Sequence, residues 1–158
     1  MTNQKKDLAH EELLSVLQTA KNRLEHLTQN DWMLIVDRAK RVAFKKDDVL
    51  IQVGKQHKVV YLVVKGAARV ETASKAFLAR LEPGEVFGEM AFLENGVASA
   101  TVVAAGELEV CEIEWTALSD LFELYPHMGS RFYRSLAVNL SRRLREVIVV
   151  KQGTKSPS

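Results

Sequence analysis

Residues 83–101 read PGEVFGEMAFLENGVASAT and hold the most specific pattern in this 158-residue chain. The pair Pro83-Gly84 predicts a turn, and Met90–Leu93 predicts one helical turn that is ended by Asn95-Gly96. Backbone N–H groups at a helix start have no partner within the helix and point outward. Gly88 lets a ligand approach the main chain without meeting a side chain. The segment therefore predicts an anion-binding loop.

This segment resembles the phosphate-binding cassette of the cyclic nucleotide-binding domain family, which includes catabolite activator-type regulators, cAMP-dependent kinase regulatory subunits and cyclic-nucleotide-gated channels. The family pattern is Phe-Gly-Glu-aliphatic-Ala-Leu, a short loop, then Arg-x-Ala-Thr. The resemblance implies that Glu89 accepts the ribose 2′-hydroxyl of the ligand. It also implies an arginine that grips the cyclic phosphate, and Ala98 stands at that position. The ligand-binding residues expected on this basis are Phe87, Gly88, Glu89, Met90, Ala91, Phe92, Ala98, Ser99 and Ala100.

The resemblance extends from about Leu27 to Arg145, because residues 44–51 and 60–66 look like the opening strands of the family. It implies an α+β, mainly β fold, in which an antiparallel β-roll or jelly roll is flanked by N-terminal helices and a long C-terminal helix. The residues themselves agree, since short β-rich runs alternate with turn residues. These runs are Val49–Val53, Val59–Val64, Ala67–Glu71, Phe77–Leu81, Thr101–Ala104 and Leu108–Trp115.

Two of the predicted strands carry apolar residues in unusual phase. Val59–Val64 is entirely apolar, which predicts burial on both faces of the sheet. In the last strand, Leu108 and Val110 are out of phase with Cys111, Ile113 and Trp115, which predicts a bulge or burial on both faces. We expect Cys111 to be a buried thiol, and because it is the one cysteine of the chain, no intrachain disulfide can form.

Helical spacing occurs on both sides of the β-rich region. A first helix is expected over Leu8–Leu27, with Leu13, Leu17, Ala20, Leu24 and Leu27 along one stripe. A second helix is expected over Asp31–Lys40, with Asp31 as its N-cap and Trp32, Leu34 and Ile35 facing the core. Further helices are expected over Thr116–Leu124 and from Pro126 to about residue 148, with Phe132, Leu136, Leu140, Leu144 and Val147 as the apolar stripe.

The length and the 47% hydrophobic content fit one ordinary domain. We expect this domain over residues 8–150, with helices in 8–40, the β-roll in 42–115 and C-terminal helices in 116–148. Residues 1–7 and 151–158 are polar and are expected to be a flexible tail and a disordered tail. No apolar run long enough to span a bilayer is present, so we expect a cytoplasmic protein.

Charge points to no class of partner, because 22 basic and 20 acidic residues are mostly interleaved and give a net charge of +2. The final helix carries five arginines, Arg131, Arg134, Arg142, Arg143 and Arg145, which are more typical of a solvated face than of a nucleic-acid or lipid site. The sequence ends soon after this helix, so we expect no helix-turn-helix and no direct DNA binding by that route. A homodimer through Leu13–Leu27 or Leu136–Val147 stays open, as does an unidentified effector protein.

Catalysis has little support in the sequence. A metal-dependent cupin shares the jelly-roll outline but needs clustered histidines, whereas His10, His26, His57 and His127 are scattered. No serine-hydrolase elbow, Walker loop or His-Glu-x-x-His motif is present. We therefore expect a protein that is not an enzyme and has neither a resident cofactor nor a metal, with cAMP or cGMP as the ligand implied by the resemblance.

Ala98 leaves two hypotheses open. A hydrogen bond to a charged group contributes about 1.5–3 kcal/mol, so loss of the arginine weakens binding roughly 10- to 150-fold. In the first hypothesis the chain still senses a cyclic nucleotide or related phosphate ligand and relays binding by movement of the C-terminal helix. Arg80, Lys65 or Arg69 would then supply the missing charge. In the second, the cassette is degenerate, binds no nucleotide, and serves as a scaffold for dimerisation or protein interaction.

Overall fold

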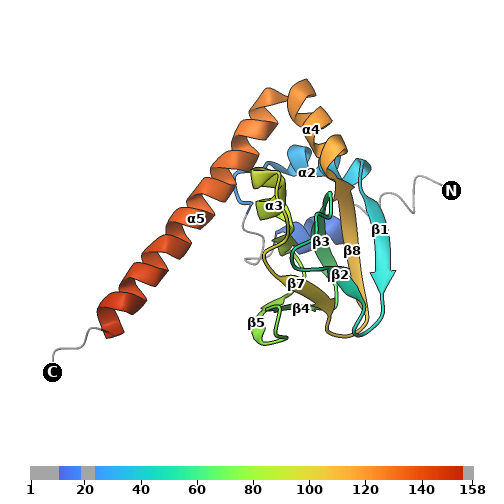
Figure 1. Cartoon of the computed structure of the whole chain (residues 1–158). Coiled ribbons are helices and arrows are strands. Elements are labelled where there is room, and N and C mark those ends of the chain that lie inside the picture. The colour runs from blue at the N-terminus through green and yellow to red at the C-terminus, as the bar shows by residue number, and fades with distance from the viewer. Residues whose placement is uncertain (1–10, 19–23, 155–158) are drawn as a thin grey trace.

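The computed structural model describes residues 11–18 and 24–154 of the chain. After a helical segment over 11–17, the order is α2 (Gln29–Asp37), β1 (Lys40–Phe44), β2 (Val49–Ile51), β3 (Val59–Lys65), β4 (Ala68–Glu71), β5 (Phe77–Leu81), β6 (Val86–Phe87), α3 (Glu89–Glu94), β7 (Thr101–Ala104), β8 (Leu108–Glu114), α4 (Trp115–Leu124) and α5 (Pro126–Thr154). Figure 1 shows the strands gathered into a roll, with α2 and α4 at its top and α5 along its left side.

Two antiparallel sheets form the roll. The first has the strand order β1-β8-β3-β6 and the second β2-β7-β4-β5. The expected mainly β fold with flanking helices is confirmed. The six predicted strand runs are all strands within one or two residues, whereas β1 and the two-residue β6 are additional.

Strand β3 is buried on both faces, as its apolar run predicts. Tyr61 and Val63 belong to the core between the two sheets, and Val60, Leu62 and Val64 belong to the core beneath the helices. Strand β8 divides in the same way, with Leu108 and Val110 inside the roll and Cys111 and Ile113 on the helical side. The out-of-phase residues of β8 are therefore explained by burial on both faces, and the register irregularity of this pair lies in β3, between Val63 and Lys65.

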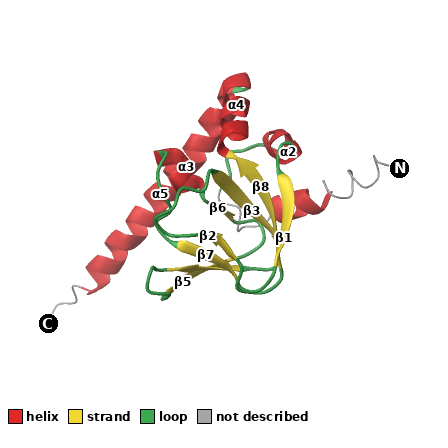
Figure 2. Cartoon of the chain, turned by 45° about the vertical axis from the view of Figure 1, so that its right-hand side comes forward, coloured by secondary structure: helices red, strands yellow, loops and turns green. Residues whose placement is uncertain are grey.

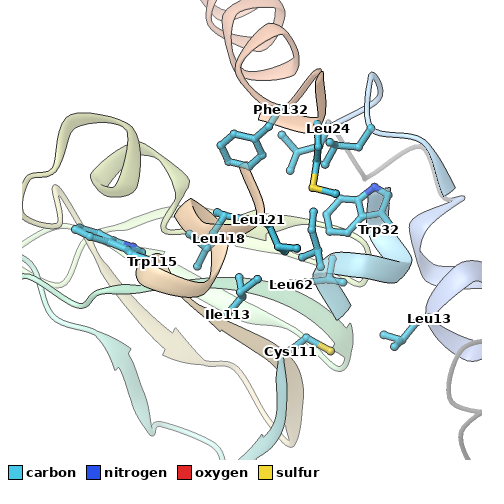
Figure 3. Close-up of a cluster of buried hydrophobic side chains, with 14 of the residues drawn as sticks. Leu13, Leu24, Trp32, Leu62, Cys111, Ile113, Trp115, Leu118, Leu121 and Phe132 are labelled. Atoms are coloured by element: carbon cyan, nitrogen blue, oxygen red, sulfur yellow. The ribbon is translucent and has the colours of Figure 1, made fainter. Parts of the chain in front are cut away.

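The core beneath the helices joins residues that are far apart in sequence. Figure 3 shows Leu13 and Leu24 from the N-terminal part, Trp32 of α2, Leu118 and Leu121 of α4 and Phe132 of α5 around strand residues Leu62, Cys111 and Ile113. Cys111 is 6% exposed, which confirms the buried thiol, and burial raises its pKa to about 11. Helices α2, α4 and α5 are thereby fixed to the outer face of the first sheet.

The second helix begins earlier than predicted. Its N-cap is Thr28, and Asp31 is the third helical residue. The Thr28 hydroxyl accepts from the Asp31 N–H at 3.1 Å, while the Asp31 carboxylate accepts from the Thr28 N–H at 2.9 Å. The assignment of Asp31 as N-cap was therefore wrong, because the residues form a capping box in which an acidic side chain reaches back to the cap. The helix ends at Asp37, and Lys40 starts β1.

The predicted helix over Leu8–Leu27 is not continuous. Residues 11–17 are helical, but Leu24–Thr28 form a turn, and Ala20 lies outside the described residues. Leu13, Leu24 and Leu27 are 4–8% exposed in the core of their own domain. This stripe therefore has little apolar surface to offer a second copy of the chain.

The last helix is longer than predicted and runs to Thr154, beyond the expected end at 148. Figure 1 shows its C-terminal half extending away from the roll. The expected tail over 1–7 and the last four residues lie outside the described residues. Within the described residues, no helix combines the length and apolar content that crossing a membrane requires.

Candidate functional site

The entry to α3 requires glycine. Gly88 is the N-cap of this helix and has a left-handed φ of +86°. A Cβ at this position would lie 2.9 Å from the backbone oxygen of Val59. An L-side chain is therefore disfavoured both by backbone conformation and by the neighbouring strand. Phe87, just before it, stacks on Tyr61 inside the roll with ring centroids 4.8 Å apart, which anchors the start of the helix.

The end of α3 and the loop after it are held by backbone hydrogen bonds. Asn95 caps the helix in the left-handed region (φ +50°), which confirms the predicted stop. Ala98 accepts from the Gly54 N–H at 2.8 Å and donates its own N–H to the oxygen of Lys55 at 3.0 Å. The Thr101 hydroxyl accepts from the Val53 N–H at 3.1 Å. The loop is thus pinned to the segment after β2, and the Ala98 N–H is already used.

A cavity of about 470 Å³ lies between α3, this loop, the second sheet and α5. Figure 2 shows α3 and α5 on the same side of the roll, which places both beside this cavity. Eight of the nine predicted site residues line it, namely Phe87, Gly88, Glu89, Met90, Ala91, Ala98, Ser99 and Ala100. The sequence motif does not predict the other lining residues, which are Ile51, His57, Val70, Ala79, Leu81, Val86, Glu94, Val97, Val102 and Arg143.

Phe92 is the predicted site residue that does not line the cavity. Its ring packs edge-to-face against Trp115, Phe122 and Phe132, with centroid distances of 5.9, 6.3 and 5.9 Å. These partners lie at the start of α4, in α4 and in α5. Phe92 therefore connects the cassette helix to the two C-terminal helices.

Glu89 is placed between the main cavity and a smaller one. The smaller cavity, of about 50 Å³, is lined by Glu85, Glu89, Leu136, Asn139, Arg143 and three apolar residues. The Oε2 atom of Glu89 is buried and accepts no hydrogen bond within the described residues. Burial raises the pKa of Glu89, and the positive charge of Arg143 opposes that shift. The carboxylate is therefore a buried acceptor at the wall of the cavity.

Arg143 is the one arginine or lysine among the described residues that line the cavity. The three cations considered from sequence are engaged elsewhere. Lys65 pairs with Glu12 at 3.0 Å, Arg69 with Asp47 at 3.1 Å and Glu71 at 3.2 Å, and Arg80 approaches Glu82 at 3.7 Å. The charge at this cavity therefore comes from α5 and not from the neighbouring strands.

Four of the five arginines of α5 are exposed, as expected for solvated residues, and Arg131 is half-buried. Arg131 makes a bidentate pair with Asp31 at 2.6 and 2.7 Å, and Arg142 pairs with Glu25. Arg143 is exposed too, but it also lines the cavity, a position that the expectation of a solvated face does not predict. The spacing of Phe132, Leu136, Asn139 and Arg143, by four, three and four residues, places the exposed Arg143 on the same side of the helix as three buried residues, and this spacing is present in the sequence.

Comparison with known families agrees with this geometry. A profile of the cyclic nucleotide-binding domain matches residues 41–125. The chain belongs to the cyclic nucleotide-binding domain family. The matched range contains all of the predicted cassette segment, residues 83–101, and α5 lies beyond it. Phe87–Ala91 and Ala98, which the sequence predicts to be ligand-binding residues, all lie within the matched range.

Two sequence relatives carry this domain within longer proteins. Cyclic GMP-binding protein C of Dictyostelium discoideum is 32% identical over 80% of this chain, and cyclic AMP receptor protein of Thermus thermophilus is 36% identical over 55%. The chain covers only 5% and 40% of these relatives, respectively.

Solved structures give the same fold. The catabolite activator protein of Thermus thermophilus matches 83% of this chain and 62% of its own, with a TM-score of 0.69 and 29% identity. A cyclic nucleotide-binding domain from Methylobacillus flagellatus matches 96% of this chain and 87% of its own, with a TM-score of 0.72. At 19% identity, the second comparison bears on the fold alone.

Proposed function

We propose that this chain is a regulatory domain that binds a cyclic nucleotide, cAMP or cGMP, in the cavity beside α3 and relays binding through α5. The observation that carries the proposal is the cavity itself, because eight predicted cassette residues converge on it and α5 forms part of its wall. The names of the two relatives, for cyclic GMP binding and cyclic AMP reception, support this ligand class. The domain acts without a resident cofactor and catalyses no reaction of its own.

Glu89 is suited to bind the ribose of the ligand. A buried carboxylate oxygen with no protein donor pairs well with a ribose hydroxyl, because such a charge-assisted hydrogen bond offsets the cost of burial. Small side chains at Ala91, Ala98 and Ala100 also line the cavity and leave space for the cyclic phosphate. Ser99 adds an exposed hydroxyl there.

The relay rests on two features that link the predicted cassette to α5. Arg143 lines the cavity from α5, and Phe92 of α3 packs against Phe132 of α5. A ligand that engages α3 and α5 together stabilises the arrangement in which both elements approach it. We propose that α5 then shifts against the roll and passes the change to a partner or to a second copy of the chain.

Isothermal titration of the purified chain with cAMP and cGMP, up to millimolar ligand, tests binding. We expect saturable binding, weakened about 10-fold or more in Glu89→Ala through loss of a charged hydrogen bond. Glu123→Ala removes an exposed carboxylate from α4 and is the matched control, with affinity unchanged. Flat titrations of the wild-type chain would contradict the proposal.

A degenerate scaffold is the second candidate function. It is favoured by Ala98 and by the exposed apolar side chains of the distal half of α5, which are Leu144, Val147, Ile148, Val149 and Val150. In this alternative the chain binds no nucleotide, and α5 is a surface for dimerisation or protein interaction. The Ala98→Arg variant separates the two candidates: acquired or tighter cAMP binding supports sensing, whereas continued lack of binding supports the scaffold.

A further inference from the structure

We propose that the negative charge of the ligand is held by Arg143 of α5, in place of the arginine that the cassette lacks. This inference rests on the proposed function and names the residue that recognises the charge. An anionic phosphodiester needs a cationic or hydrogen-bonding partner once it leaves water, because an unpaired buried charge is costly. Arg143 is the one arginine or lysine lining the cavity among the described residues.

Geometry favours Arg143 over the other basic residues nearby. Ala79 and Leu81 of β5 line the cavity, so the intervening Arg80 lies on the opposite face of the strand. Arg142 is adjacent in sequence, yet it points to Glu25 and does not line the cavity. The register of α5 therefore brings one arginine to the ligand and directs its neighbour to the N-terminal part of the chain.

Glu89 gives a reason for Arg143 to stay at the cavity before ligand binds. Both residues line the main cavity and the smaller one, and the field of Arg143 acts on the Glu89 carboxylate. The Arg143 side chain is also exposed, so it can reorient toward an incoming anion without breaking any ion pair recorded among the described residues. A cyclic phosphate and Glu89 can then share the donors of one guanidinium.

The placement of the charge has a regulatory consequence. In the cassette pattern the cation stands on the roll, next to the phosphate-binding loop, whereas here it stands on a separate helix. Ligand charge and α5 position are then linked reciprocally: the ligand draws α5 to the cavity, and any partner that holds α5 there raises affinity for the ligand. An uncharged nucleoside would occupy the cavity without engaging this coupling.

Paired titrations with cAMP and adenosine test the inference, because the two ligands share base and sugar and differ in the charged cyclic phosphate. For the wild-type chain we expect cAMP to bind at least about 10-fold more tightly than adenosine. Arg143→Gln should weaken cAMP binding about 10- to 150-fold and leave adenosine affinity nearly unchanged. Arg142→Gln removes the same charge one residue away and should alter neither affinity. In Ala98→Arg/Arg143→Gln, preference for cAMP should return.

The outcomes separate this inference from the proposed function. If Arg143→Gln weakens both ligands equally, or neither, Arg143 does not hold the charge and the inference fails while the binding function stands. The same holds if the wild-type chain binds adenosine as tightly as cAMP. If neither ligand binds the wild-type chain at millimolar concentration, both proposals fail. Circular dichroism and melting temperature of each variant establish that it is folded.

Discussion

At the scale of single residues, Glu89 is a buried carboxylate whose protonation depends on the fold. Burial raises its pKa, while Arg143 from α5 opposes the rise, and Glu85 lines the same small cavity. The folded state therefore holds the Glu89 proton more tightly than the unfolded state does. Stability falls as the pH rises from the unfolded pKa, about 4.3 for glutamate, through the higher folded pKa.

Replacing Glu89 by glutamine removes this titration at nearly constant shape. We expect Glu89→Gln to melt at a higher temperature than the wild-type chain at neutral pH, and this advantage to shrink toward zero below about pH 4, where Glu89 is protonated in both states. Melting curves across this pH range measure the difference. Glu94→Gln, on the same helix with an exposed side chain, is the control. An advantage that does not change with pH would contradict the argument.

Gly54 and Gly66 have the same left-handed φ of +81° but different surroundings, so substitutions at these two positions distinguish backbone strain from steric collision. A Cβ at Gly66 would lie 2.1 Å from the backbone oxygen of Glu107, whereas at Gly54 nothing lies within 4 Å. Gly54→Ala should lose about 1–2 kcal/mol of unfolding free energy from the positive φ alone. Gly66→Ala should lose more unfolding free energy, because the backbone of Glu107, just before β8, must also move. Urea unfolding measures both, and equal losses would contradict the steric argument.

At the scale of elements, the sequence predicted the helices and strands that have a regular pattern of apolar residues. It did not predict the strands that form only because they pair with a neighbouring strand. β6 contains only Val86 and Phe87 and exists because it pairs with Leu62 and Tyr61 of β3. β1 has no strong alternation, and its register comes from β8. The heptad-like spacing from Leu13 to Leu27 predicts one helix, but the same spacing also arises when a turn brings apolar residues onto the same core, as Leu24–Thr28 do here.

In the candidate site, too, a local motif predicts some residues, whereas others depend on tertiary packing. Cassette residues from Phe87 to Ala91 are contiguous, so a motif could place them beside one another, and the cavity includes them all. Phe92 follows them in sequence but points away, because successive residues of a helix are rotated by about 100°. Arg143 lies far along the chain, and its place at the cavity depends on how α5 packs over the roll, which no local motif encodes.

The start of α2 depends on Asp31, which links two elements at once. Asp31 is 2% exposed, completes the capping box with Thr28 and accepts two hydrogen bonds from Arg131 of α5. Although burial alone would raise it, the hydrogen bonds from Arg131 and from the Thr28 N–H hold the pKa of Asp31 below its usual value. Its contribution to stability is therefore present above the unfolded pKa, about 3.9 for aspartate, and is lost as the pH falls through the lower folded pKa.

We expect Thr28→Ala to lower the free energy of unfolding by about 1 kcal/mol through loss of one cap hydrogen bond. Asp31→Asn should lower it by more, since it weakens both the capping box and the ion pair to α5. Chemical unfolding at neutral pH measures both losses, and the loss from Asp31→Asn should diminish in acid. Asp120→Asn, exposed on α4, is the control. Equal losses from the two α2 variants would show that the link to Arg131 contributes nothing.

At the scale of the whole molecule, the roll and the helical layer meet at the cavity. Val86 and Phe87 lead out of the roll, α3 packs through Phe92 on the helical core, and α5 continues past the cavity. The first part of α5 is fixed, with Met128, Phe132 and Leu136 at most 4% exposed. The second part has few contacts with the domain, so it is the element that a ligand or a second copy can reposition at least cost.

The distal half of α5 is the surface on which we expect self-association. Leu140, Leu144 and Val147 are 38–61% exposed and are spaced by four and three residues, as in a helix-pairing stripe, whereas Leu136 is buried in its own domain. Complete burial of one such side chain is worth about 1.5–3 kcal/mol. The homodimer expected over Leu136–Val147 is therefore expected here over Leu140–Val147.

Leu144→Glu/Val147→Glu places two carboxylates in this stripe and should shift the chain from dimer to monomer at micromolar concentration in analytical ultracentrifugation. Leu78→Glu is the matched control, since Leu78 is 56% exposed on edge strand β5 and should leave the dimer intact. If α5 is both the ligand-responsive element and the pairing surface, saturating cAMP should also change the dimer dissociation constant of the wild-type chain, by the reciprocity of linked equilibria. A wild-type chain that sediments as a monomer with and without ligand would exclude α5 pairing as the route of output.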